Sequence, residues 1–141
     1  GAQGGLFPDS VADWLAGSVF RVSEQSDRVG VRLTGARIEP PGDGRGRSEG
    51  TVPGSVQFPA GGEPIVLGVD GPTTGGYPVP ACVIAADLPA LGQLRPRDEV
   101  RFEWVDRARA VELLRDMEIL IASVGPKTTV SGYEKVDHDG R

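Results

Sequence analysis

Residues 62–86 read GEPIVLGVDGPTTGGYPVPACVIAA, and this stretch decides the class of fold that the chain can adopt. Residues 64–69 and 79–85 are continuous apolar runs whose length is typical of β-strands covered on both faces. Between them, residues 70–78 carry glycines and prolines that punctuate the chain as a turn. The stretch therefore predicts two buried strands on either side of a glycine-rich connection.

Further strands are predicted on both sides of this stretch from β-forming side chains or from apolar–polar alternation. Val29, Val31 and Leu33, for example, alternate with Gly30 and Arg32, which is the pattern of a half-buried strand. We expect these additional strands over residues 19–22, 29–33, 36–39, 55–58 and 100–104.

Three helices are predicted, over residues 8–17, over residues 87–94 and from Asp106 onward. The third has an apolar stripe at helical spacing, formed by Ala110, Leu113, Met117 and Leu120. Strands outnumber helices, and the 21 glycines and 12 prolines supply frequent turns. The pattern favours a mainly β sandwich or barrel with one to three short helices.

The domain organisation that we expect is one barrel domain over residues 1–118 and a polar tail over residues 119–141. Residues 40–54 have almost no apolar content and are predicted to form a loop within the domain. We expect mobility in residues 40–52 and beyond about residue 123, because little apolar area there offsets the cost of ordering.

Charge and residue counts exclude several classes of protein. The net charge of −5 leaves no basic surface for nucleic acid or anionic membranes, and no run of 18 apolar residues or signal segment occurs, so we expect a cytoplasmic protein. One histidine and one cysteine exclude the common zinc ligand sets and make a Ser-His-Asp triad implausible. Cys82 lies in an apolar run and is expected to pack in the core.

Residues 73–78, Thr-Thr-Gly-Gly-Tyr-Pro, carry the strongest signal of a ligand site. Glycines let the backbone approach a ligand, hydroxyls offer hydrogen bonds, and the ring of Tyr77 can stack on a flat molecule. A tight hairpin that merely needs its glycines explains the same residues. Asp87 is either a functional carboxylate or a helix N-cap, and Arg28 either binds a carboxylate ligand or pairs with surface acids.

Several segments resemble the allophanate hydrolase subunit 2 family, also called KipA-like, which includes the C subunit of 5-oxoprolinase. They follow the family's order from about Phe7 to Trp104. They are QSDRVGVRLTG (residues 25–35), PGSVQFP (53–59), GEPIVLGV (62–69), TTGGYP (73–78), IAADL (84–88) and LRP (94–96).

This resemblance implies a cyclophilin-like closed β-barrel with two or three short helices. It implies a component of an ATP-dependent 5-oxoprolinase-like amide hydrolase that is not active alone and binds a KipI-like partner. Alternatives are a non-catalytic regulator that antagonises a KipI-like kinase inhibitor, and the carboxyltransferase domain of a urea carboxylase-like enzyme. The chain itself would hold no cofactor, with ATP or biotin bound elsewhere in the assembly.

The small-molecule amide or carboxylate ligand would contact eight residues: Thr73, Thr74, Gly75, Gly76, Tyr77, Gln57, Arg28 and Asp87. We expect Tyr77 to line a pocket rather than fill the core. Two positions depart from the family, which usually has glutamine where Pro72 stands and a basic residue where Val79 stands. Family proteins are about twice as long as this chain, and the match corresponds to their C-terminal half.

Overall fold

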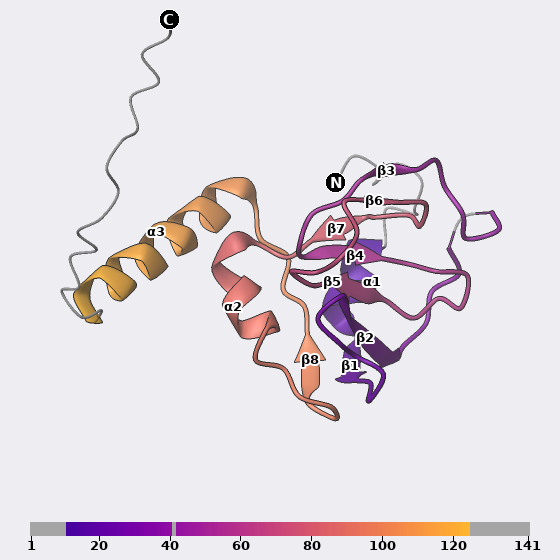
Figure 1. Ribbon diagram of the computed structural model, residues 1–141, viewed down its shortest axis with the longest axis horizontal. Coiled ribbons are helices and arrows are strands. Elements are labelled where there is room, and N and C mark those ends of the chain that lie inside the picture. The colour runs from indigo at the N-terminus through magenta and orange to yellow at the C-terminus, as the bar shows by residue number, and fades with distance from the viewer. Residues whose placement is uncertain (1–10, 41, 125–141) are drawn as a thin grey trace, which may run out of the picture.

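The computed structural model describes residues 11–40 and 42–124 (Figure 1). The expected tail beyond residue 124 lies outside these ranges, as do the first residues of the first predicted helix. The helical elements are α1 (Val11–Gly17), the 3-10 helix η2 (Ala85–Asp87), α2 (Leu88–Leu91) and α3 (Arg107–Val124). The strands are β1 (Val19–Val22), β2 (Gly30–Gly35), β3 (Glu49–Gly50), β4 (Ser55–Gln57), β5 (Ile65–Leu67), β6 (Thr74–Gly75), β7 (Ala81–Cys82) and β8 (Glu99–Arg101).

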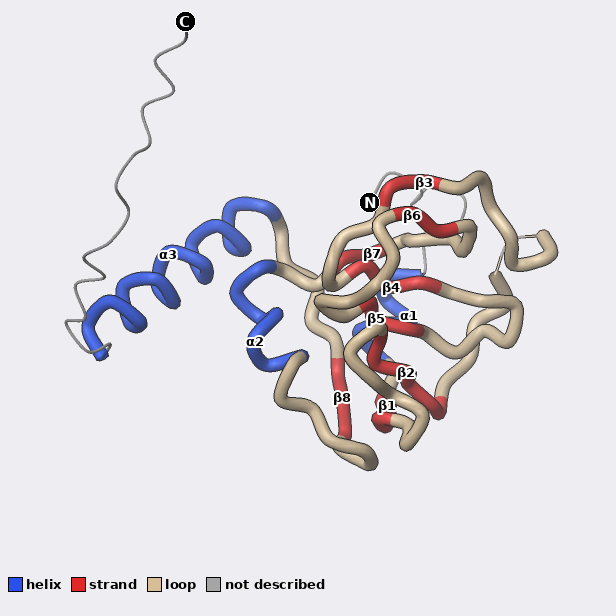
Figure 2. Tube along the Cα trace, in the orientation of Figure 1, coloured by secondary structure: helices blue, strands red, loops and turns tan. Residues whose placement is uncertain are grey.

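Six of the strands form one antiparallel sheet in the order β7-β4-β5-β2-β1-β8. The sheet is curled into a half-barrel, and β3 and β6 form a separate two-stranded ribbon beside it (Figure 2). The mainly β architecture is as predicted. The expected closure of the barrel is not seen, because within the described residues β7 and β8 remain the two edges of the sheet.

An aromatic cluster joins α1 to the sheet. Trp14 packs edge-on against Phe20 and Phe58, with ring centroids 5.6 and 5.8 Å apart, and Phe20 packs in the same way against Phe102 at 5.7 Å. Phe20 and Phe58 are completely buried, and Leu15 of α1 is nearly so. The alternation predicted for residues 29–33 explains this core, since Val31 and Leu33 of β2 point into it.

Residues 36–39 do not form the predicted strand. Ile38 donates one backbone hydrogen bond to Gly62 (3.1 Å), but the chain then meets Pro40, which has no N–H with which to continue a ladder. The polar loop of residues 40–54 contains the short strand β3, which we did not predict. Whether residues 40–52 are mobile stays a prediction.

The two apolar runs of residues 62–86 form shorter strands than we predicted. In the first run Val69 is 72% exposed, because the chain turns at Gly68, whose N–H donates to the carbonyl of Val29 (2.9 Å). In the second run Ala81 and Cys82 form the short strand β7, and the N–H of Val83 donates to the carbonyl of Gly54 (2.8 Å). Cys82 is exposed, so the expectation that it packs in the core is wrong: β7 is an edge strand and is covered on one side only.

The third predicted helix is present and begins as expected. The carboxylate of Asp106 accepts a hydrogen bond from the N–H of Arg109 (2.8 Å), which is an N-cap interaction. α3 continues to Val124 and so includes residue 118, and the domain boundary that we expect there stays a prediction. Its last turns extend away from the sheet in Figure 1, and Ile119, Leu120 and Ile121 are exposed there.

Candidate functional site

Residues 73–78 do not form a tight hairpin between two paired strands. β5 and β7 lie on opposite sides of β4 and do not pair with each other. The connection between them leaves the sheet as β6, where Gly75 pairs with Glu49 and Thr74 with Gly50. The ribbon is extended by a backbone bond from Gly46 to Gly76 (2.6 Å) and by one from Thr51 to Thr73 (2.9 Å).

Gln57 lies directly beneath this ribbon. It is the last residue of β4 and is only 4% exposed, yet its Nε2 atom makes no hydrogen bond within the part of the chain that the structure describes. A Cβ atom on Gly75 would lie 2.6 Å from that nitrogen, so only glycine allows the ribbon to approach it this closely. A buried donor without a partner costs about 1–3 kcal/mol. The amide of Gln57 is therefore a hydrogen-bond donor that the fold itself leaves unused.

Thr51 is a residue of this ribbon that sequence reasoning missed. It is buried, and its hydroxyl donates to the carbonyl of Pro72. Its methyl carbon would lie 3.5 Å from a Cβ on Gly75. Nothing in the sequence around Thr51 marks it, because its importance comes from a contact with a segment 21 residues away.

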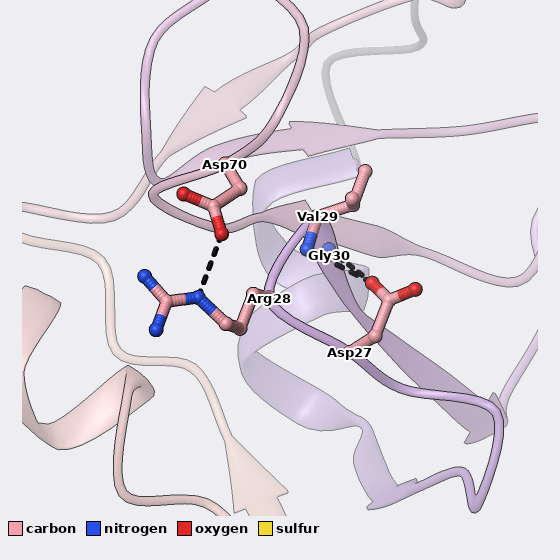
Figure 3. A network of polar contacts seen from close by, with 5 residues as sticks. All are labelled: Asp27, Arg28, Val29, Gly30 and Asp70. Carbon is pink, nitrogen blue, oxygen red and sulfur yellow. Dashed lines mark hydrogen bonds and ion pairs between the residues drawn. The ribbon is translucent and has the colours of Figure 1, made fainter.

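Arg28 is paired with Asp70, as the surface alternative predicted, and Figure 3 shows the pair. The Nε atom of Arg28 donates to Oδ2 of Asp70 at 2.6 Å, and both side chains are largely exposed. This hydrogen bond, reinforced by the negative charge of Asp70, raises the pKa of Arg28. Asp27 does not contact the guanidinium, because its carboxylate accepts from the N–H groups of Val29 (2.9 Å) and Gly30 (3.1 Å).

The pairing of Arg28 with Asp70 joins the loop before β2 to the start of the connection that carries the ribbon. Asp70 also donates a backbone hydrogen bond to the carbonyl of Arg28 (3.2 Å). A Cβ on Gly68 would lie only 2.2 Å from that same carbonyl oxygen, so the two segments are in close contact. Arg28 is thus placed to position the connection that leads to Thr73.

Tyr77 and Asp87 occupy different surroundings. Tyr77 is 42% exposed, so its ring does not fill the core, whereas the neighbouring Pro78 is buried. Asp87 stands at the end of η2 and occupies the N-cap position of α2, as the simpler interpretation expected, but its side chain makes no capping hydrogen bond to the described residues. It lines a groove of about 720 Å³ whose walls include none of the other seven candidates.

The structure thus brings Thr74, Gly75 and Gln57 together, with Thr73, Gly76 and Tyr77 on the same exposed connection. It leaves Asp87 on the separate groove, where Cys82 also lies. Atoms around Cys82 partly desolvate its sulfur, although the residue is exposed overall, and this raises the pKa of the thiol.

Among the described residues, no cluster of three or more metal-binding side chains is present, and none of the helices has the length and apolarity needed to cross a membrane.

Comparison with protein families matches residues 1–104 to the carboxyltransferase domain, subdomain A and B. The chain is 39% identical over 101 residues to the C subunit of 5-oxoprolinase from Escherichia coli K12, an alignment that covers 72% of this chain and 33% of that protein. The match therefore spans about a third of the length of that relative.

A second group of similar proteins extends further along the chain. Urea amidolyase of Saccharomyces cerevisiae is 28% identical over 126 residues, which covers 83% of this chain and 7% of that protein. The crystal structure of urea carboxylase from Kluyveromyces lactis is 26% identical, superposes with a TM-score of 0.76 and covers 85% of this chain and 11% of that one. A superposed segment that covers 85% of the 141 residues is longer than the family match over residues 1–104. This segment therefore includes part of α3.

Proposed function

The chain belongs to the carboxyltransferase domain family with subdomains A and B, and from that membership we propose that it is one component of a 5-oxoprolinase-like amide hydrolase. In this proposal the chain works in the cytoplasm, binds a small amide or carboxylate ligand and a KipI-like partner, and does not turn over substrate alone. ATP or biotin, where the assembly uses them, binds to other components.

The observation that carries the proposal is the 39% identity to the C subunit of E. coli 5-oxoprolinase, over nearly three quarters of the chain. The family match over residues 1–104 includes all eight candidate site residues. That relative is by its name one subunit of an enzyme, which is why we propose dependence on partners.

The geometry of the ribbon supports a site for a carbonyl or carboxylate oxygen. Thr73 and Thr74 expose their side chains, and the adjacent glycines leave the backbone open to a ligand. Beneath them the Nε2 atom of Gln57 offers a donor that has no partner among residues 11–40 and 42–124. Both 5-oxoproline and its hydrolysis product carry oxygens that accept hydrogen bonds from such groups.

Arg28 and Asp87 take less direct roles in the proposal. Because its guanidinium is bonded to Asp70, Arg28 acts by holding the connection in place and meets the ligand only if that pair opens. Asp87 faces the groove, so it contacts the ligand only where the assembly brings that surface to the site.

A second candidate is the carboxyltransferase domain of a urea carboxylase-like enzyme. Two findings favour it. The match to the S. cerevisiae urea amidolyase covers 83% of this chain, and the K. lactis urea carboxylase superposes with a TM-score of 0.76 over a span that includes part of α3. A non-catalytic regulator is favoured by Pro72 and Val79, which replace a polar and a basic residue beside the ribbon. The three functions predict different outcomes in one reconstitution: hydrolysis of 5-oxoproline, urea-dependent ATP cleavage, or binding without turnover.

The resemblance implies that a 5-oxoprolinase of this family also contains a KipI-like subunit and a LamB/YcsF-type subunit. The test therefore combines the purified chain with these two proteins and measures ATP-dependent hydrolysis of 5-oxoproline. We expect turnover only in the full mixture, with a loss in Thr74→Val and near-normal turnover in Thr74→Ser, which keeps the hydroxyl. Urea-dependent ATP cleavage instead would support the second candidate. Binding of the KipI-like protein without any turnover would support the regulator.

A further inference from the structure

The two edges of the half-barrel border the same groove. β7 pairs only with β4 and β8 only with β1 among the described residues, so each presents one row of backbone N–H and C=O groups without a strand partner. The groove of about 720 Å³ is lined by residues from both strands. We call this groove the seam. Its apolar lining includes Leu15, Ala81, Val83, Val100, Phe102 and Leu113.

The register of β8 shows which of its backbone groups face the seam. The N–H of Val22 donates to the carbonyl of Asp98 (2.9 Å), and Phe20 stands opposite Val100 two residues further along. In an antiparallel pair the residues bonded to the neighbour alternate with residues whose N–H and C=O groups point the other way. Glu99 and Arg101 therefore direct their backbone groups toward the seam.

The charges at the seam favour a partner with basic side chains. Arg101 forms an ion pair with Glu99 (2.9 Å), and Arg109 with Glu112 (2.6 Å). Asp87 and Glu103 also line the groove, and neither has an ion-pair partner within residues 11–40 and 42–124. An incoming segment with a lysine or arginine at the rim would complement these two carboxylates.

We propose that the seam receives an extended strand from the remainder of a carboxyltransferase unit, the two thirds of the relatives' length that this chain does not match. The strand hydrogen-bonds to the edge of β8, lays alternate apolar side chains on Val100 and Phe102, and thereby continues the half-barrel. A strand fits better than a helix, because the seam offers two rows of backbone partners that only an extended chain can use. This strand is not the KipI-like partner, and either interaction can exist without the other.

The test co-expresses the chain with the unmatched two thirds of its E. coli 5-oxoprolinase relative, so that neither part has to fold alone. Molar mass from light scattering reports the complex. Cys82 is the only cysteine of the chain and lines the seam, so its alkylation rate, followed by mass spectrometry, reports whether the seam is filled. Hydrogen exchange of β8 reports whether its edge becomes paired.

Two variants make the test specific for strand pairing. Arg101→Pro removes an N–H that faces the seam and leaves the bonds between β8 and β1 intact, whereas Arg101→Ala removes the same side chain and keeps the N–H. We expect a 1:1 complex, alkylation of Cys82 slowed by about tenfold or more, and affinity about two- to tenfold lower for Arg101→Pro than for Arg101→Ala.

The inference is overturned by any of three results. The first is the absence of a complex, and the second is a complex in which Cys82 reacts at the rate of the free chain. The third is equal binding by the two Arg101 variants while both keep the thermal stability of the parent. A homodimer of the chain alone that protects Cys82 would also overturn it, because a second copy would then occupy the seam.

Discussion

Replacing Gly75 by alanine tests the close contact between the ribbon and Gln57. The added Cβ would lie 2.6 Å from Gln57 Nε2, well inside van der Waals contact, and 3.5 Å from the methyl group of Thr51. Gln57 is only 4% exposed, so its amide has little room to withdraw. Overpacking of this kind costs about 1–3 kcal/mol in the free energy of unfolding.

Gly76→Ala is the matched control, because a Cβ at that position meets no atom closer than 3.7 Å. We expect it to change stability by less than about 0.5 kcal/mol. Both variants are measured by urea unfolding, in the parent chain and in a Gln57→Ala background that removes the clashing amide. In that background the cost of Gly75→Ala should fall to about that of the control. A cost that is small, or that is unchanged without the Gln57 amide, would refute the contact.

Other consequences follow from individual side chains. Tyr77→Ala should destabilise the fold by less than the 3–5 kcal/mol or so typical of a core aromatic, because the ring is 42% exposed, while ligand or partner binding weakens by about 1–3 kcal/mol. Unfolding and binding are measured on the same variant, and a core-sized loss with unchanged binding would make Tyr77 structural. Arg28→Ala should leave the urea-unfolding midpoint close to that of the parent chain, since its ion pair is exposed; a large drop in the midpoint would contradict a surface pair. Because the folded chain raises the pKa of the Cys82 thiol, alkylation at pH 7.5 should be slower than in the unfolded chain, and the rate should keep rising above the ordinary thiol pKa of about 8.5. Equal rates in both states would show that the sulfur is not desolvated.

Local patterns predicted the parts of the fold whose interactions are local. β1 occupies the residues expected from its β-forming side chains, and the Asp106 cap was recognised from the carboxylate that precedes the helix. The exposure of Cys82 could not be predicted in the same way. An apolar run looks the same whether its strand lies inside the sheet or at its edge, and only the pairing order decides between them.

In the candidate site, too, local sequence signals could be predicted and contacts between distant segments could not. Residues 73–78 were recognisable from their glycines and hydroxyls, Arg28 and Asp87 gave weaker signals, and the family resemblance added Gln57. That Gly75 lies over the amide of Gln57, and that Arg28 pairs with Asp70 rather than Asp27, depends on contacts between segments far apart in the sequence. The pairing of β3 with β6 was missed for the same reason, because β3 lies in a loop with almost no apolar side chains.

The measurement that tests the proposed ligand site most directly is the NMR signal of the Gln57 side-chain amide. The 14.8 kDa chain, labelled with ¹⁵N and mixed with its unlabelled KipI-like partner, is titrated with 5-oxoproline. Binding beneath the ribbon should shift the Gln57 amide resonances and the backbone signals of Thr74 and Gly75, and leave those of Asp87 unchanged unless the assembly brings the groove to the site. An assembly that hydrolyses 5-oxoproline while the Gln57 amide stays unshifted at saturation would place the substrate elsewhere and contradict the site.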